Sequence, residues 1–464
     1  CGSGAFLVAA MKILIDIYSA EVEKIKLSKN TELKNWLSAI EKDHPSLLYF
    51  IKKKIITDNV YGVDIMEEAV EIARLRLFLT LAASANTLEE LEPLPNIDFN
   101  ILPGNSLIGL IKVDEDRFDE IEKAKPTATD YKDAVQGNFF KNVSVQKSLF
   151  GSSHAASYQK LVKEREILIH DYKYYEESML RQDGLVSGVE PRHNKLDLQS
   201  LRTSIHKKEK DAHAVLDKLL LAEFEHLRIE YEEATWDEKK NEEGKPKKRP
   251  VNMADIVSLK PFHWGYSFSE IFRNGGFDCI LTNPPWEIFK PNAKEFFLEY
   301  SELVTRKKMD IKSFEKEKGK LLQDKDLRRA WLNYLNAFPH VSLFFRNSTN
   351  YKNQISIVND KKAGTDINLY KLFTEQCFNL LKPNGDCGIV IPSGIYTDLG
   401  TKQLREMLFS QTNITGLFCF ENRKEIFENV HRSFKFVVLT FEKSTIPTKN
   451  FPAAFMRHDV RELE

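Results

Sequence analysis

A four-residue segment, Asn283-Pro284-Pro285-Trp286, carries the residue types with the clearest chemistry in this sequence. Two consecutive prolines cannot continue a sheet ladder, so the apolar run at residues 277–282 is expected to be a buried strand that stops there. The amide oxygen of Asn283 and the carbonyl of Pro284 could accept both hydrogens of an exocyclic amino group, and Trp286 could stack on the attached base. This geometry suits methyl transfer to an adenine flipped out of a duplex. An ordinary Asn-Pro turn followed by a core tryptophan is the alternative.

A second group of candidates lies at the start of the chain, where Cys1-Gly2-Ser3-Gly4-Ala5-Phe6 leads directly into a helical pattern. Glycines let backbone approach a ligand closely, and a helix N-terminus offers unpaired N–H donors. The strand expected at residues 60–65 ends in Asp64, and a carboxylate in that place commonly accepts the ribose hydroxyls of a nucleoside. Capping of the following helix is the competing role for Asp64.

A third expected strand, residues 97–102, leads into Pro103-Gly104-Asn105-Ser106-Leu107. The Asn105 amide could hydrogen-bond an adenine edge, and a plain turn is the competing interpretation. All three segments carry their candidate residues at the C-terminal end of an expected strand. A nucleoside site at the edge of an α/β sheet requires that order, so we expect an α/β fold.

Taken together, these segments resemble a DNA adenine-N6 methyltransferase of the class whose cofactor motif precedes its catalytic tetrapeptide. More narrowly, the chain resembles the large methylases of type IIG restriction-modification and phage-exclusion systems. The resemblance rests on five segments, at residues 1–6, 62–65, 104–107, 262–286 and 366–385. It implies a Rossmann-like S-adenosylmethionine-dependent methyltransferase sheet, interrupted by large helical insertions, that acts on double-stranded DNA.

The resemblance also implies roles for individual residues. Catalysis is assigned to the tetrapeptide at residues 283–286, without a metal, a general base or a covalent enzyme intermediate. Phe427 would flank the target base together with Trp286; Phe434 is a weaker candidate, and core packing is the alternative for both phenylalanines. The expected contacts to S-adenosylmethionine come from Cys1, Gly2, Ser3, Gly4, Phe6, Asp64, Ile65, Asn105, Ser106 and Leu107.

The resemblance implies an Asp-Pro-Ala or similar triplet before the Cys-Gly-Ser-Gly turn, whereas this chain starts inside that motif. We therefore expect a fragment of a longer protein, which also ends without a closing structural element. A DNA-specificity domain would follow it, and any nuclease domain would precede it. Other subunits of a defence system are further candidate partners.

The expected organisation is a catalytic domain split by insertions. In the first insertion, heptad-like apolar spacing predicts an antiparallel helical hairpin, with Tyr172 to Tyr175 expected to pack in its seam rather than touch nucleic acid. Residues 237–250 are expected to form a solvated, mobile loop, with phosphate contact by residues 245–249 as the alternative. The expected segments are a cofactor-binding half at 1–110, the helical insertion with its charged loop at 111–260, the catalytic strand and loop at 261–290, a second helical insertion at 291–365, and a C-terminal half at 366–464.

The amino-acid composition limits how the chain could bind DNA and which compartment it could occupy. The 464 residues include 67 Lys and Arg against 68 Asp and Glu, so DNA binding must rest on local patches. Five cysteines show neither metal spacing nor a disulfide pattern, which indicates a reducing cytoplasm, and Cys279 and Cys387 are expected in the core. The apolar runs are too short to span a bilayer, so no membrane partner is expected.

Two other classes of function remain open. An RNA or protein-glutamine methyltransferase could carry the same kind of loop, although the large insertions argue against it. A non-catalytic DNA-binding or assembly subunit of a defence complex is the second class, and the intact Asn283 argues against it. A combined restriction and modification enzyme would need a nuclease outside these residues.

Overall fold

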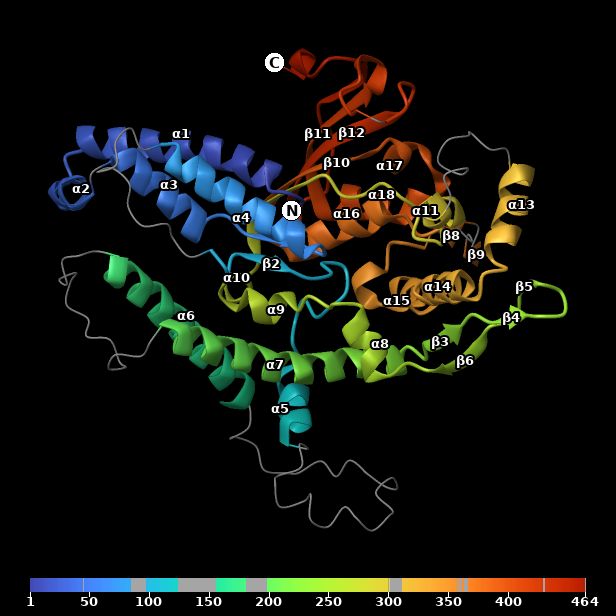
Figure 1. Ribbon diagram of the computed structural model, residues 1–464. Coiled ribbons are helices and arrows are strands. Elements are labelled where there is room, and N and C mark those ends of the chain that lie inside the picture. Colours follow the sequence, from blue (N-terminus) through green and yellow to red (C-terminus); the bar gives the residue numbers. More distant parts are fainter. Residues whose placement is uncertain are drawn as a thin grey trace, which may run out of the picture. The chain divides into compact units, whose positions relative to one another are not determined.

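The structure is a computed structural model, and it divides into two compact units (Figure 1). Unit 1 comprises Cys1–Leu220 and Ile256–Ser269, and unit 2 comprises Leu221–Asp255 and Glu270–Glu464. The described residues are 1–44, 46–84, 97–123, 156–180, 198–298, 300, 311–355, 357–358, 361–362, 366–428 and 430–463.

Unit 1 begins with helices packed on a short parallel strand pair. Helices α2 and α3 start at side-chain caps, because Asn30 accepts from Leu33 N and Ser46 accepts from Tyr49 N. Residues from α1, α3 and α4 that are fully buried, such as Met11, form the core beneath the strands. The elements are α1 (Ala5–Leu27), α2 (Thr31–Asp43), α3 (Leu47–Asp58), β1 (Gly62–Asp64), α4 (Glu67–Ala82) and β2 (Ile101–Pro103).

Strand β2 is shorter than the sequence predicts. Residues 97–100 form a turn rather than a strand, and Asn100 N donates to Ile97 O. The buried Asn100 side chain donates instead to carbonyls at the end of α3, Ile56 O and Thr57 O, and to Val60 O. Carbonyls at the end of a helix lack a donor within the helix, and the turn places the Asn100 amide where it can donate to them.

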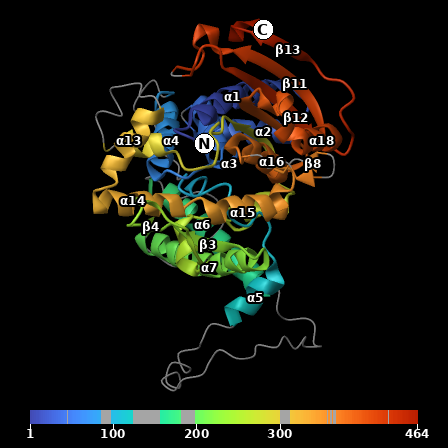
Figure 2. The same ribbon diagram turned by 90° about the vertical axis from the view of Figure 1, so that its right-hand side faces the viewer.

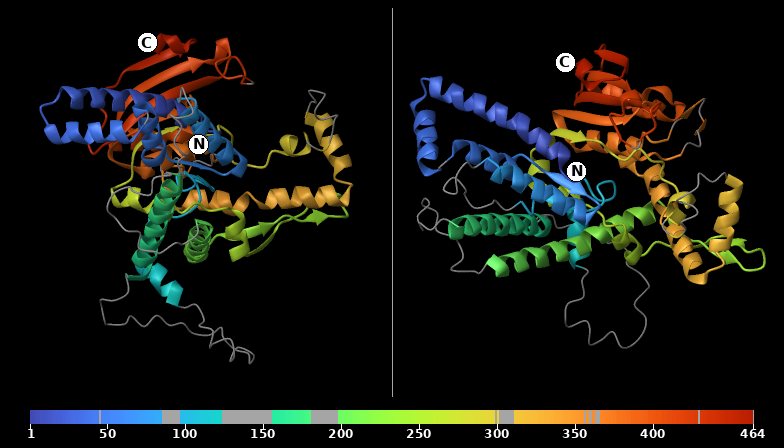
Figure 3. Two further views of the ribbon diagram at one scale, coloured as in Figure 1. Left: turned by 60° about the vertical axis from the view of Figure 1, so that its left-hand side comes forward. Right: turned by 45° about the horizontal axis from the view of Figure 1, so that its top comes forward.

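The first insertion contributes two long helices that lie antiparallel, α6 (Ala156–Leu180) and α7 (Leu198–His226) (Figure 3). Arg165 pairs with Glu209 across them at 3.2 Å. Tyr172 is buried against Leu201 and Ile205, as a packing seam requires. The loop between the helices lies outside the described residues. The neighbouring elements of this region are α5 (Glu115–Lys123), α8 (Met253–Ser258), α9 (Trp264–Ser267) and α10 (Ser269–Arg273).

Unit 2 contains a five-stranded mixed sheet in the order β13-β11-β12-β10-β7. Strands β13, β11 and β12 of this sheet are labelled in Figure 2. Strand β7 runs parallel to β10, β12 runs antiparallel to both β10 and β11, and β13 runs parallel to β11. The strands are β7 (Phe277–Thr282), β10 (Leu381–Pro392), β11 (Thr412–Glu421), β12 (Lys435–Lys443) and β13 (Ala453–Arg457).

Helices α16 (Leu369–Leu380) and α18 (Lys402–Gln411) bury an apolar core with this sheet. The core includes Ile389, Leu404 and Phe441, which are fully buried. The short helix α17 (Gly394–Thr397) follows β10. The 3-10 turns of unit 2 are η2 (Thr349–Tyr351), η3 (Leu399–Thr401), η4 (Asn422–Lys424) and η5 (Val460–Leu463).

Two expectations about this sheet are wrong. Strand β7 is not buried: among the described residues it pairs only with β10, and both Cys279 and Leu281 are exposed. An edge strand has one unpaired side, so its apolar run does not guarantee burial. Strand β13 was not predicted, because Ala453–Arg457 is short and follows a stretch without apolar alternation. Cys387 is buried, as predicted.

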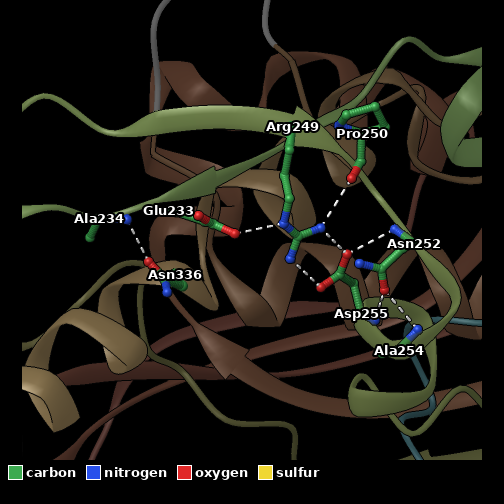
Figure 4. A network of polar contacts seen from close by, with 8 residues as sticks. All are labelled: Glu233, Ala234, Arg249, Pro250, Asn252, Ala254, Asp255 and Asn336. Atoms are coloured by element: carbon green, nitrogen blue, oxygen red, sulfur yellow. Dashed lines mark hydrogen bonds and ion pairs between the residues drawn. The ribbon is translucent and has the colours of Figure 1, made fainter.

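The charged stretch at residues 237–250 is an ordered hairpin rather than a mobile loop. Strands β3 (Glu230–Glu233) and β6 (Lys247–Pro250) pair antiparallel, and β4 (Trp236–Asp237) pairs with β5 (Glu242–Glu243). Opposite charges face each other across the strands, which stabilises this pairing. Arg249 bonds both Asp255 and Glu233 (Figure 4), so its charge is already neutralised within the protein.

The second insertion follows β7 and is mainly helical. Its helices pack an aromatic cluster around Trp331, which is buried with Phe297 and Phe314. Arg328 is also buried and pairs with Glu238 at 2.9 Å, so its charge is neutralised within the protein. The elements are α11 (Ala293–Leu298), α13 (Ile311–Leu321), α14 (Lys325–Asn336), α15 (Pro339–Asn347), β8 (Ile357–Val358) and β9 (Lys361–Lys362). No helix in the described part of the chain is both long and apolar enough to cross a membrane.

Candidate functional site

The glycine turn at the start of the chain has a backbone that only glycine adopts readily. Gly2 has a φ of 56° and Gly4 a φ of 85°, and helix α1 begins immediately after them. A Cβ on Gly4 would lie 3.0 Å from both Cα and Cβ of Ala73 in α4. The second glycine therefore permits both the left-handed backbone and a close approach of the turn to α4.

Asp64, at the end of β1, joins this turn to α4. Its Oδ2 accepts from Gly2 N at 2.8 Å, and its Oδ1 accepts from Met66 N at 3.0 Å. The backbone nitrogen of Cys1 donates to Val63 O at 2.6 Å. The structure thus brings the predicted glycine turn and the predicted acidic residue into direct contact. The alternative role as helix cap is wrong, because the N-cap of α4 is Met66 and no side chain caps that helix.

The loop after β2 lies beside the same strand end, since Gly104 N donates to Asp64 O at 2.7 Å. Asn105 Oδ1 accepts from Leu107 N, so the oxygen of this amide serves the turn. The amide nitrogen of Asn105 is the atom left to contact an adenine edge. Leu107 is buried, and its side chain is a packing residue.

A residue group that the sequence analysis left without a role supports this loop. Trp264 Nε1 donates to Ser106 O at 3.0 Å, and Phe262 N donates to Ile108 O at 2.8 Å. A Cβ on Gly104 would lie 2.9 Å from the Phe262 ring. The Phe262-His263-Trp264 triplet formed part of the family resemblance, and that was the only signal in the sequence pointing to it.

The remaining cofactor candidates differ in exposure. Phe6 and Ile65 are 36% and 52% exposed, so their apolar side chains are accessible next to the turn. Ser3 lies within the turn, between the two glycines. All ten candidates belong to unit 1, whereas the Asn-Pro-Pro-Trp tetrapeptide belongs to unit 2.

The tetrapeptide follows β7 directly and has no regular secondary structure. Asn283 is exposed, while Pro284 is buried and Pro285 is exposed. Beyond Trp286 the chain is fixed again, because Leu369 N donates to Glu287 O at 3.0 Å and Phe289 N donates to Ile367 O at 2.7 Å. The loop is thus short, proline-stiffened and anchored at both ends, with its amide accessible.

Trp286 lies among aromatic rings of the sheet. Its Nε1 donates to Val390 O at 3.2 Å, which fixes the indole orientation. The Phe434 ring is stacked on it with centroids 5.3 Å apart and an interplanar angle of 6°. The Phe427 ring stands edge-on at 5.3 Å and 84°. Both phenylalanines named from the sequence therefore contact the tryptophan, and Trp286 also packs against the core, as the alternative interpretation holds.

The charges near these rings are paired. Glu425, in the loop that carries Phe427, accepts from Arg432 Nε at 2.9 Å, and this hydrogen bond lowers the pKa of Glu425. None of the four residues of the tetrapeptide titrates near neutral pH. Across the residues that the structure describes, no cluster of three or more His, Cys, Asp or Glu could hold a metal ion.

The Eco57I restriction-modification methylase profile matches residues 58–328 and 342–427 of this chain. The chain therefore belongs to the Eco57I restriction-modification methylase family. Its α/β fold is that of a methyltransferase sheet interrupted by helical insertions, as predicted.

Among curated relatives, a Methanocaldococcus jannaschii protein described as "Putative type II restriction enzyme and methyltransferase" is 32% identical over 307 residues, which cover 63% of this chain and 22% of the relative. The type II restriction enzyme and methyltransferase RM.Eco57I of Escherichia coli is 34% identical over 115 residues, or 23% of this chain and 10% of that protein. The chain thus spans about a fifth or less of these relatives.

Among solved structures, a nuclease-deletion mutant of the type ISP restriction-modification enzyme LlaGI, in complex with a DNA substrate mimic, is 13% identical. The match covers 42% of this chain and 16% of that one, with a TM-score of 0.23. A score this low supports no structural inference.

Proposed function

We propose that this protein transfers a methyl group from S-adenosylmethionine to N6 of a flipped adenine in double-stranded DNA, as the modification activity of a restriction-modification or phage-defence system. The observation that carries this proposal is the exposed Asn283 on a proline-stiffened loop that is anchored at both ends beside Trp286. Membership of the family supports the reaction class.

The tetrapeptide has the atoms that an adenine amino group needs. Its N6 nitrogen is a poor nucleophile because the lone pair is delocalised into the ring. Hydrogen bonds from N6–H to Asn283 Oδ1 and the Pro284 carbonyl would concentrate electron density on that nitrogen. Acceptors that are fixed before the reaction are the kind that lower a barrier, because they need no reorganisation. The released amino proton would leave to water.

The aromatic residues supply a surface for the base. Trp286 and Phe427 stand at right angles, so one can present a ring face and the other a ring edge to the same adenine. Stacking would offset part of the unpairing and unstacking free energy, which is a few kcal/mol. Asn283, Pro284, Pro285 and Trp286 are the proposed catalytic residues, and Phe427 is the proposed partner in base stacking.

The glycine turn and the Asp64 carboxylate fit S-adenosylmethionine. Gly2 and Gly4 have no side chains to obstruct a ligand, Asp64 could accept from ribose hydroxyls, and Asn105 Nδ2 could donate to the adenine edge. The bound cofactor would supply the electrophilic methyl group. Cys1, Ser3, Phe6, Ile65, Ser106 and Leu107 complete the proposed site, and Leu107 contributes through packing.

We infer that DNA contact depends on local charge, because Lys and Arg do not exceed Asp and Glu overall. The returning side of the hairpin offers the exposed Lys245 and Lys247, whereas Lys248 is paired with Glu232 and Arg249 with Asp255. A nuclease domain, a specificity domain and other defence subunits are proposed partners from outside this chain.

The test is to express the protein from its complete gene in a methylation-deficient bacterial host and to map modified bases by single-molecule sequencing. The proposal predicts N6-methyladenine at one sequence motif with the wild type and none with Asn283→Ala. If neither strain contains modified adenine and labelled methyl groups are found in RNA or protein, the substrate is RNA or protein rather than DNA.

A further inference from the structure

The loop that carries Phe427 and Phe434 is held together by one buried side chain, Asn422. This residue follows β11 directly and is 0% exposed. Its Nδ2 donates to Phe427 O at 2.9 Å and to Val430 O at 2.8 Å, and its Oδ1 accepts from Phe427 N at 2.9 Å. Both backbone groups of Phe427 are therefore bonded to the same amide.

The backbone of Asn422 binds the same loop. Its N–H donates to Phe434 O at 3.0 Å, and its carbonyl accepts from Glu425 N at 2.9 Å. Glu425 has a φ of 54°, an uncommon backbone for a residue other than glycine. Asn422 thus bonds the loop near its start, at its middle and at its end, although residues 425–428 and 430–434 of this loop have no regular secondary structure.

This bonding pattern requires an amide. Two carbonyls need donors and one N–H needs an acceptor, and only a side chain with both at this length serves all three. Removal of the amide would leave three partly buried backbone groups without their partner, which is costly. The loop would then lose the bonds that hold Phe427 in place.

The bonds to Asn422 affect the proposed base site through the rings of Phe427 and Phe434. Phe427 stands against Trp286 and against Phe436, with centroids 4.8 Å apart in the second pair. Phe434, by contrast, is 36% exposed and lies flat on Trp286 at 5.3 Å. Two rings that sandwich a base must stand about 7 Å apart, which is two van der Waals contacts of about 3.5 Å. Phe434 would therefore have to move before a base could stack on the face of Trp286 that it covers. Phe427, by contrast, is held by the hydrogen bonds of both its backbone groups to Asn422.

We propose that Asn422 is the positioning residue of the target-base site: it fixes Phe427 against Trp286 so that one wall of the site is formed before the adenine arrives. This inference rests on the proposed function. Asn422 touches neither base nor cofactor in this role and acts through Phe427. A merely structural asparagine would stabilise the sheet without any specific coupling to Phe427.

The test is a double-mutant cycle with Asn422→Ala and Phe427→Leu in the protein from its complete gene. The target adenine, located by sequencing, is replaced with 2-aminopurine in a duplex to report flipping, and single-turnover methylation is measured on the unsubstituted duplex. We expect Asn422→Ala to slow methylation by about tenfold to a hundredfold, as misplacement of a reacting group does. The same change should add little, less than about threefold, once Phe427 is already leucine.

Two controls separate this effect from general instability. Asn413→Ala changes an exposed asparagine of strand β11, whose side chain makes a 3.4 Å contact to Glu442, and should leave methylation unchanged. Cofactor affinity, measured by calorimetry, should stay within about twofold in Asn422→Ala, because the effect is confined to base positioning. If Asn422→Ala does not fold, Asn422→Asp replaces it in the cycle, because it keeps the volume and the acceptor for Phe427 N.

Each outcome decides the proposal. Wild-type methylation rates in the Asn422 variant, or an effect that is fully additive with Phe427→Leu, would overturn it and leave the proposed function intact. Slow methylation with unchanged 2-aminopurine fluorescence would also overturn it, because positioning of the flipped base must alter that signal. A wild-type protein that methylates no base would overturn both this inference and the proposed function.

Discussion

The glycine turn of unit 1 and the aromatic loop of unit 2 are built on opposite principles. The first is fixed by backbone conformation and by hydrogen bonds to one carboxylate, Asp64, and it presents few side chains. The second is fixed by ring packing around Trp286 and by the amide of Asn422. The first arrangement suits a polar cofactor that must be approached closely, and the second suits a flat base. Substitutions in the glycine turn should therefore alter cofactor affinity, and substitutions in the aromatic loop should alter the methylation rate.

The largest expected effect is that of Asn283→Ala. Loss of the acceptor should reduce the methylation rate about a hundredfold to a thousandfold, as loss of one preorganised hydrogen-bonding group does in other enzymes. Cofactor affinity should stay nearly unchanged, because the proposed partner of Asn283 is the adenine amino group and not the cofactor. Radiolabelled methyl transfer and calorimetry measure the two quantities.

Asn292→Ala is the matched control for this prediction, because Asn292 is also exposed and lies nine positions further along the chain in the same unit. It should retain wild-type methylation. Equal losses in the two variants would mean that Asn283 has no special role.

Asp64→Ala should instead lower the affinity for the cofactor. Removal of a charged hydrogen-bond partner worth roughly 1.5–3 kcal/mol should weaken S-adenosylmethionine binding by one to two orders of magnitude. Asp58→Ala, which removes an exposed carboxylate paired with Lys54 on α3, should leave the affinity unchanged. Calorimetry that found the same dissociation constant for Asp64→Ala as for the wild type would refute the cofactor role.

A comparison of Gly4→Ala with Gly2→Ala separates backbone strain from crowding. Both glycines have positive φ, so each alanine should destabilise by about 1 kcal/mol or more. Only at Gly4 would the new Cβ meet Ala73, at 3.0 Å, whereas nothing lies within 4 Å at Gly2. Thermal unfolding should therefore rank Gly4→Ala as the less stable variant. Equal midpoints would show that the approach of the turn to α4 is unimportant.

The smallest expected effect is a pH dependence in unit 1. Burial lowers the pKa of His213 to about 4 from its usual 6.5, and the neighbouring His263 acts in the same direction. As pH falls below 6.5 the unfolded chain therefore takes up a proton that the folded chain refuses, and stability is lost until about pH 4. Between pH 8 and pH 6 the loss should be about 0.8 kcal/mol.

Denaturant unfolding at the two pH values measures this difference, and His213→Gln should remove it. A variant with the same pH dependence as the wild type would assign the effect to another group.

Much of the cofactor region could be predicted from sequence, because its signals are local. Gly2, Gly4 and Asp64 are residue types with special backbone or charge properties at the ends of short elements, and the structure brings them into contact. The support from Phe262 and Trp264 was missed, because these residues lie more than 150 positions from the loop that they hold. Local patterns carry no information about such contacts.

The aromatic region was less predictable. Phe427 and Phe434 were named, yet Asn422 was not, because an asparagine after a strand normally indicates a turn. The exposure of Cys279 and the ordered hairpin at residues 230–250 were missed for a related reason: both depend on which strand pairs with which. Strand pairing between distant residues is decided by tertiary packing, which outweighs local propensity.

The most direct test of the central claim is chemical. The protein is incubated with S-adenosylmethionine carrying a deuterated methyl group and with duplex DNA, and the digested nucleosides are analysed by mass spectrometry. The proposal predicts labelled N6-methyladenine with the wild type and none with Asn283→Ala. Label on the N4 position of cytosine, in RNA or on a protein glutamine, with no labelled adenine in DNA, would contradict it.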